Sequence, residues 1–219
     1  MSVPPFFVMP KNVFFSLGLP AAENTFYQLS DGDLIRQCNE RKIEIPNETG
    51  SIFNAKGKEA VRIPKELFIV KDNLPLNSVE WNDIYKPIKQ KFFDDLYKKM
   101  TDHLSGKEIW IRDSYFYLDA PNRMFIRSIS DDPAGDLFIY RMFLHPTQEE
   151  LANFNPGWYL IVASSFSVDP ETDGIHQNDF VMVNYVKKVI LVGGLPYTAE
   201  IKEIIFGILN FALLQERKA

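Results

Sequence analysis

The sequence predicts an α/β (α+β) protein of a single domain, in which helices pack on a mixed β-sheet. Apolar and alternating runs with the length of strands are interleaved with amphipathic helical stretches. They do not follow the regular strand–helix–strand alternation that builds a fully parallel sheet. No linker rich in proline, glycine or serine divides the 219 residues. We therefore expect an N-terminal arm over residues 1–28 and one domain over residues 29–219.

The first third of the chain is expected to hold one helix and two short strands. Ser30 and Asp33 resemble a capping box, so a helix is expected to begin there. Its apolar face is short: Leu34, Ile35 and Cys38. A turn and two strand-like pieces follow, at residues 46–50, 51–54 and 67–70.

A longer helix is expected to open at Pro87, since proline suits the first turn of a helix, and to end at Gly106. Its apolar residues recur in steps of four: Ile88, Phe92, Leu96, Met100 and Leu104.

The remainder of the chain is rich in expected strands, at residues 109–117, 124–129, 137–144, 158–163, 180–185 and 189–192. The last two are joined through residues 186–188 as a hairpin. Thr147 and Glu150 cap a short helix. The final helix carries an apolar stripe with helical spacing: Ile201, Ile204, Ile205, Ile208, Leu209 and Ala212.

The composition is that of a folded globular chain and excludes several functions. Hydrophobic residues make up 46% and charged residues 24%, and the net charge is -5 without any long basic tract, which argues against nucleic-acid binding. The one cysteine, Cys38, excludes an internal disulfide, and the three histidines have no metal-ligand spacing. No apolar run reaches the roughly 18–20 residues of a membrane span, and prolines interrupt the N-terminal apolar stretch. We expect a reduced, cytoplasmic setting and no membrane partner.

A basic loop is the first candidate site. Lys56, Lys58, Arg62 and Lys65 lie within ten residues and are offset only by Glu59. An arginine fork pairs well with a carboxylate or phosphate, so the loop is a candidate site for a small anion. A solvated basic loop explains the same composition.

A strand–glycine–helix junction is the second candidate. Gly193 and Gly194 precede Tyr197 and the final helix, and the free N–H groups of a helix N-terminus favour anions. Such junctions are also common as plain architecture. The sequence contains no phosphate-binding loop of the G-x-x-x-x-G-K-[ST] type, no GxGxxG and no GxSxG. Ser164 and Ser165 are interpreted as a turn at a strand end, because no histidine is placed by sequence to activate them.

Several collinear segments resemble the ATP-dependent phosphoenolpyruvate carboxykinases. GKEAVRIPKELFIVKD is similar to the family's Gly-Lys-x-x-Gly-Arg-Ser-Pro-Lys-Asp-x-Phe-Ile-Val. VILVGGLPYTAEIKEIIFGILNF is similar to Ile-Gly-Gly-x-x-Tyr-x-Gly-Glu-Ile-Lys-Lys-x-x-Phe-x-x-Leu-Asn-Tyr. The resemblance runs from about residue 29 to residue 214, which the family's N-terminal domain would occupy, and it implies that domain's fold.

The resemblance implies a gluconeogenic lyase reaction, the decarboxylation and phosphorylation of oxaloacetate by ATP to phosphoenolpyruvate, with Mg²⁺ and Mn²⁺. In this family the N-terminal domain supplies an arginine and a tyrosine at the substrate and a lysine that ligates Mn²⁺. The matching positions here are Arg62, Tyr197 and Glu203. The nucleotide loop and the other metal ligands belong to a C-terminal domain, so no cofactor is expected for this chain alone.

Four departures from the family pattern argue against catalysis, and no catalytic residue is assigned. The lysine position holds Glu203, a charge reversal, and a single carboxylate is a poor metal site. The arginine is flanked by Val61 and Ile63 in place of glycine and serine, and β-branched residues stiffen this loop. Ala199 replaces a family glycine.

Three hypotheses follow. The first is a carboxykinase-like N-terminal domain that is inactive by itself, a pseudoenzyme. The second is a non-enzymatic interaction or small-anion-binding module that reuses the fold. The third is half of an enzyme that pairs with a separate nucleotide-binding domain. The expected partners are accordingly a small carboxylate anion, a second copy of the chain, or that separate domain.

Overall fold

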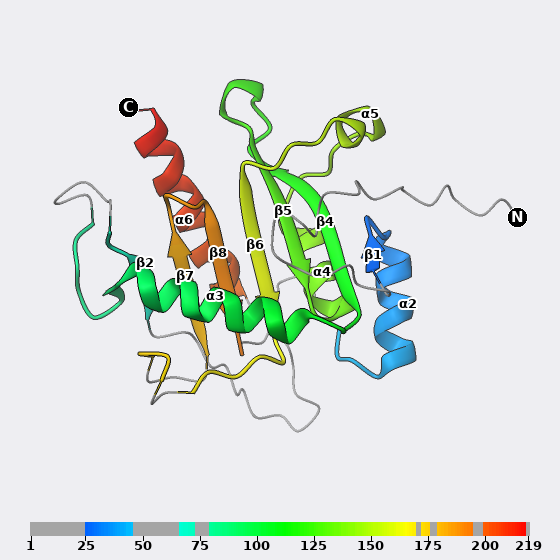
Figure 1. Ribbon diagram of the computed structural model, residues 1–219. Helices are drawn as coiled ribbons and strands as arrows, with labels where there is room; N and C mark the ends of the chain where they lie inside the picture. The colour runs from blue at the N-terminus through cyan, green and yellow to red at the C-terminus, as the bar shows by residue number, and fades with distance from the viewer. Residues whose placement is uncertain are drawn as a thin grey trace, which may run out of the picture.

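The computed structural model of the chain describes residues 25–45, 66–72, 79–169, 172–175, 179–194 and 199–217. Their centre is an eight-stranded mixed sheet with the strand order β1-β4-β5-β6-β8-β7-β2-β3 (Figure 1). The strands are β1 (Thr25–Tyr27), β2 (Leu67–Val70), β3 (Tyr85–Ile88), β4 (Ile109–Phe116), β5 (Met124–Ser130), β6 (Trp158–Ala163), β7 (Phe180–Asn184) and β8 (Val189–Gly193). The mixed α/β fold predicted from the sequence is confirmed.

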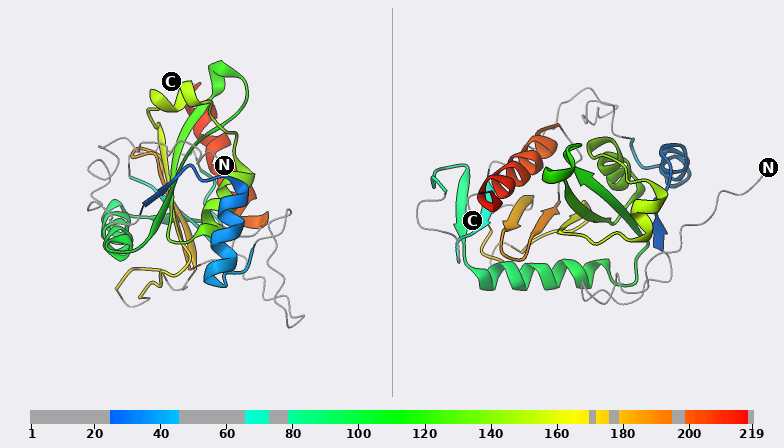
Figure 2. Two further views of the ribbon diagram at one scale, coloured as in Figure 1. Left: turned by 90° about the vertical axis from the view of Figure 1, so that its right-hand side faces the viewer. Right: turned by 90° about the horizontal axis from the view of Figure 1, so that it is seen from above.

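The sheet has helices on both of its faces. They are α2 (Asp31–Arg41), α3 (Gln90–Leu104), α4 (Pro133–Met142), α5 (Gln148–Ala152) and α6 (Ala199–Glu216), with a short 3-10 turn at Ala120–Asn122. Helix α3 covers one face, while α4 and α6 cover the other (Figure 2). Helix α2 packs beside α4, where Leu34, Trp110 and Leu137 form a small separate core.

Strand direction decides which loops share an edge of the sheet. β5, β6 and β8 are mutually parallel, so their carboxyl ends lie at one edge. β7 is antiparallel to β8, with Phe180 opposite Gly193, and β2 runs parallel to β7. The start of β2 therefore lies at the same edge as the end of β8, from which the chain leads to α6.

Two buried ion pairs stabilise strands β4 and β5 on opposite faces. Arg127 donates to both carboxylate oxygens of Asp113 at 2.6 Å, and the Tyr27 hydroxyl donates to Asp113 at 2.7 Å. On the other face, Arg112 donates to Asp136 of α4 at 2.6 and 2.9 Å. A buried charge is tolerated only when hydrogen bonds to an opposite charge satisfy it. The Arg127–Asp113 pair therefore holds β5 against β4, and the Arg112–Asp136 pair holds α4 against β4.

Several elements form where the sequence predicts them. Ser30 caps α2 by accepting from the Asp33 backbone N–H, and Thr147 with Glu150 forms the capping box of α5. β2 and β6 have the predicted bounds, and β7 and β8 form the predicted antiparallel pair. The expected turn at 46–50 and strand at 51–54 lie outside the described residues.

One predicted strand is wrong. Residues 137–144 lie mostly in helix α4, which begins at Pro133 after Asp132, whose side chain accepts from the Gly135 backbone N–H. Seven consecutive residues of α4, from Pro133 to Ile139, are buried. A helix with no exposed face needs no polar residues at helical spacing, so its sequence is a continuous apolar run. Such a run is equally typical of a buried strand, which is why the sequence predicted a strand here.

The predicted start of the long helix is also wrong. Pro87 and Ile88 belong to the edge strand β3, a position that tolerates proline, and α3 begins only at Gln90. The Gln90 backbone N–H is capped by the carboxylate of Asp72, which comes from another part of the chain. The buried face of α3 accordingly includes Phe93 in place of Phe92.

No helix in the described ranges is long and apolar enough to cross a bilayer.

Candidate functional site

Of the three residues that the resemblance singles out, Glu203 lies in the described structure. Arg62 and Tyr197 fall outside the described residues, as do Lys56, Lys58 and Lys65. The chain re-enters the described structure just after the basic loop, at the start of β2, and just after Tyr197, at the start of α6. Both points lie at the same edge of the sheet. Because Arg62 and Tyr197 themselves lie outside the described residues, their assignments stay predictions.

A groove of about 660 Å³ runs along the exposed face of α6, against the end of the sheet formed by β2 and β3. We call it the α6 groove. Its helix side is formed by residues with the spacing of one helical face: Glu200, Glu203, Ile204, Gly207, Ile208 and Phe211. Its other side is formed by Leu67, Ile69, Val79, Glu80, Ile84, Tyr85 and Tyr185.

Gly207 gives the α6 groove its depth in the middle of the helix. A Cβ atom added at this residue would have nothing within 4 Å, apart from neighbours in its own helix. The opposite face of α6, which includes Ile201, Ile205 and Leu209, is fully packed in the core. The helix is therefore anchored by one face and leaves the other accessible.

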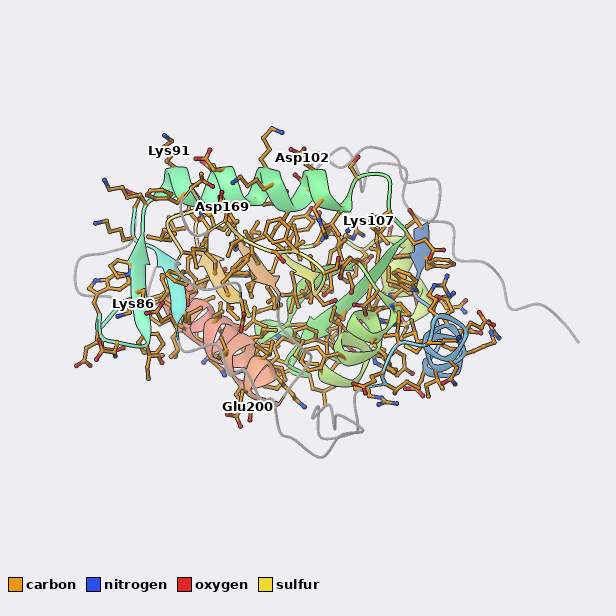
Figure 3. All side chains as sticks on the ribbon, turned by 90° about the horizontal axis from the view of Figure 1, so that it is seen from below. Lys86, Lys91, Asp102, Lys107, Asp169 and Glu200 are labelled. Atoms are coloured by element: carbon orange, nitrogen blue, oxygen red, sulfur yellow. The ribbon has the colours of Figure 1, made fainter. Side chains whose placement is uncertain are left out.

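The charge in the α6 groove is negative. Glu200 lies at the start of α6, on the side of the molecule opposite α3 (Figure 3), and Glu203 and Glu80 also line the groove. Two lysines adjoin groove residues in the sequence, but each contacts another side chain. Lys86 pairs with Glu66 and Asp83, and the Lys202 ammonium lies 5.4 Å from the centre of the Phe206 ring.

The aromatic end of the groove stays neutral. The Tyr185 ring lies 5.0 Å from the Phe211 ring, and burial, together with nearby Tyr85, raises the pKa of Tyr185 well above its usual range. The Tyr185 phenol therefore remains protonated across the physiological range and adds no charge.

A cluster of polar side chains lies at the carboxyl ends of β5 and β6, where the sequence predicted only a turn at Ser164 and Ser165. The Ser165 hydroxyl donates to Asp131 Oδ2 at 2.5 Å, and His103 Nε2 lies 2.9 Å from Ser165 Oγ. Lys107 Nζ lies 2.7 Å from His103 Nε2. His103 comes from α3, so only the packing of α3 on the sheet could have revealed this contact.

The arrangement of this cluster does not activate the serine. Asp131 also accepts from the backbone N–H groups of Ser164 and Ser165, both at 3.0 Å, so it closes the turn after β6. Lys107 occupies the Nε2 lone pair of His103, which then cannot take a proton from Ser165. We assign the cluster a structural role at the strand end.

Comparison with known proteins identifies the family. A sequence model described as phosphoenolpyruvate carboxykinase, of the ATP-dependent type, matches residues 23–219. The chain belongs to the phosphoenolpyruvate carboxykinase family. This confirms the resemblance found in the sequence, and the mixed sheet agrees with the N-terminal domain of that family.

Three relatives show how much of the family protein is present. Phosphoenolpyruvate carboxykinase (ATP) from Christiangramia forsetii is 38% identical over 187 residues, which cover 85% of this chain and 35% of the relative. That from Amoebophilus asiaticus is 31% identical over 211 residues, covering 95% and 41%. That from Bacillus cytotoxicus is 32% identical over 194 residues, covering 88% and 37%. The chain thus spans about two fifths of the length of these relatives.

The described residues do not supply the ligands that the family's manganese ion requires. The ligand position that the resemblance assigns to lysine is the carboxylate of Glu203. Within the described part of the chain, no group of three or more His, Cys, Asp or Glu side chains is arranged to hold a metal. One carboxylate is a poor site for a divalent ion, so Glu203 alone would hold Mn²⁺ only weakly.

Proposed function

We propose that this chain is the substrate-side, N-terminal domain of a phosphoenolpyruvate carboxykinase and that it does not catalyse the family reaction by itself. Its 219 residues contain no phosphate-binding loop to hold the β- and γ-phosphates of ATP. The family's gluconeogenic lyase activity would require the remaining three fifths of the relatives' length. A cytoplasmic setting belongs to the same proposal.

The observation that carries the proposal is the carboxylate of Glu203 at the start of α6. A neutral lysine that ligates Mn²⁺ would add no charge at this position, whereas Glu203 adds a negative charge to those of Glu80 and Glu200 on the same groove and repels the carboxylates of oxaloacetate. Charges a few ångströms apart near water interact by about 1 kcal/mol. The reversal therefore weakens substrate binding and supports a pseudoenzyme.

The part of the family site that remains is a weak anion site. Arg62 can bind a carboxylate bidentately, and Tyr197 can donate one hydrogen bond. A single exposed pair contributes only about 0–1 kcal/mol. We expect millimolar or weaker affinity for oxalate.

Oxalate titration followed by NMR tests the anion site in the parent and in single variants. We expect Arg62→Ala to abolish binding and Glu203→Lys to tighten it severalfold. Glu149→Lys, which makes the same charge change on the exposed surface of α5, is the control and should have little effect. Unchanged binding in both Arg62→Ala and Glu203→Lys would contradict an inherited site.

A direct activity assay tests the absence of catalysis. The purified chain, given oxaloacetate, ATP, Mg²⁺ and Mn²⁺, should form no phosphoenolpyruvate above the rate without protein. It should also not bind ATP tightly. Micromolar ATP affinity by calorimetry would overturn this part of the proposal.

An interaction module is the second candidate function, and exposed apolar side chains favour it. Ile84 is 57%, Leu118 73% and Leu214 54% exposed. Leu214 shares a surface hollow with the partly exposed Tyr117, and contiguous apolar surface of this kind is covered in many proteins by another domain or a second copy. Sedimentation tests this candidate: association that depends on concentration supports it, and a monomer at high micromolar concentration contradicts it.

A further inference from the structure

The α6 groove has the dimensions of a small-molecule site. Its volume of about 660 Å³ falls within the range of roughly 300–1,000 Å³ that is typical of ligand pockets. The helix face from Glu200 to Phe211 spans eleven residue steps, which at about 1.5 Å per residue makes the groove roughly 16 Å long. Because Gly207 has no side chain, an elongated apolar group can lie directly against the helix.

The walls of the groove are apolar and become aromatic towards one end. Leu67 and Ile204 face it along its length, and Tyr85, Tyr185 and Phe211 supply rings. Aromatic faces carry a negative quadrupole and attract cations, in addition to burying apolar surface. Such walls suit a flat or extended apolar body and do not repel a positive group.

The charges lining the groove are of one sign. Glu80 approaches from the sheet side and Glu200 and Glu203 from the helix side. In the described structure no lysine or arginine is paired with these three carboxylates, and Lys86 and Lys202 are engaged elsewhere. A ligand that brings its own positive charge gains attraction here, while an anion of the same shape is repelled.

We propose that the α6 groove binds an organic cation that carries an extended apolar or aromatic body, such as an aryl-alkylammonium ion. The ammonium group lies among Glu80, Glu200 and Glu203, and the apolar body lies over Gly207 towards Phe211. All of these residues belong to the described structure. Binding of the cation therefore does not depend on whether Arg62 binds oxalate, and the two ligands report on the two proposals separately.

The test compares three probes of the same shape and different charge: phenylbutylamine, which is protonated at pH 7, phenylbutanol and phenylbutyrate. Binding is measured by NMR titration of the labelled full chain at low salt. We expect phenylbutylamine to bind at least tenfold more tightly than phenylbutyrate, with phenylbutanol between them. The shifted signals should belong to α6, β2 and the 79–85 segment.

Two variants separate the charge of the groove from its shape. Glu200→Gln with Glu203→Gln should remove most of the preference for the amine, while Glu40→Gln with Glu149→Gln removes two exposed charges elsewhere and should leave that preference intact. Gly207→Leu places a side chain in open space and should block all three probes. The backbone spectrum of each variant verifies that it is folded.

The proposal would be overturned by equal or tighter binding of phenylbutyrate, by an unchanged preference for the amine in the Glu200→Gln and Glu203→Gln variant, or by unchanged amine binding in folded Gly207→Leu. Failure of the amine to bind the parent chain at millimolar concentration would also overturn it. Oxalate binding is judged separately by its loss in Arg62→Ala, because Arg62 is not among the residues that line the groove.

Discussion

Replacing Gly207 with alanine should stabilise the protein, because this glycine is in an exposed helix interior with empty space beside it. Glycine costs about 0.8–1.0 kcal/mol relative to alanine at such a position, through the larger backbone entropy of the unfolded chain. The added methyl group meets nothing within 4 Å outside its own helix, so no steric cost offsets this gain. We expect the free energy of unfolding to rise by about 1 kcal/mol.

Thermal and urea denaturation of the purified parent and Gly207→Ala proteins measure the effect. For a chain of about this length, 1 kcal/mol corresponds to roughly 2–4 °C in Tm. The urea midpoint should rise while the slope of the transition stays constant. An unchanged or lower stability would refute the reasoning, because it would mean that the groove is closed at Gly207 and the methyl group clashes.

Gly193 provides a matched control at the end of β8. A Cβ atom added there would lie 2.7 Å from Cζ of the Phe180 ring and 3.3 Å from the Phe166 ring. Both rings are buried, so the same glycine-to-alanine change should here cost about 1–3 kcal/mol through overpacking. If the free energy of unfolding rises in Gly207→Ala and falls in Gly193→Ala, the difference reflects local packing and not a general effect of alanine.

Three further measurements follow from titratable groups that are buried or partly buried. Asp113→Asn should lower the free energy of unfolding by about 3–5 kcal/mol in urea denaturation, because it leaves the buried Arg127 guanidinium without its counter-charge. Cys38 is fully buried, which shields it from reagents and raises its pKa to about 11, so a thiol reagent at neutral pH should label it only as fast as the protein opens; labelling at the rate of a free thiol would contradict this. Burial and Lys107 lower the pKa of His103, so the folded state binds fewer protons there and stability should fall as the pH drops through and below about 6.5. His103→Gln should flatten that part of the stability profile, and an identical profile in this variant would contradict the assignment.

Elements with a local chemical signal were predictable from the sequence. Ser30 and the Thr147–Glu150 pair are caps made by residues three positions apart, so the sequence contains both partners. Most of the core face of α6 follows from its apolar spacing, although Ile204 of the predicted stripe lines the α6 groove. In contrast, the start of α3 depends on Asp72, which lies eighteen positions before Gln90, and no local pattern contains that contact.

The candidate site was predictable only in part. Glu203 was found by its place in a family motif, and the assignments of Arg62 and Tyr197 remain predictions. The α6 groove could not be predicted, because it exists only where α6 lies beside β2 and the 79–85 segment. The His103–Ser165 contact was missed for the same reason, since it joins residues 62 positions apart.

The edge strand β3 determines how copies of this protein can meet. Pro87 has no N–H group, and the Tyr85 N–H is already bonded to the side chain of Asn82 at 2.9 Å. Alternate residues of a strand point their N–H groups to the same side, so neither of these two can donate to an incoming chain. At the other end of the sheet, β1 comprises three of the described residues. Neither edge is suited to recruit a further strand, and association between copies would therefore leave each sheet separate and depend on contacts between side chains.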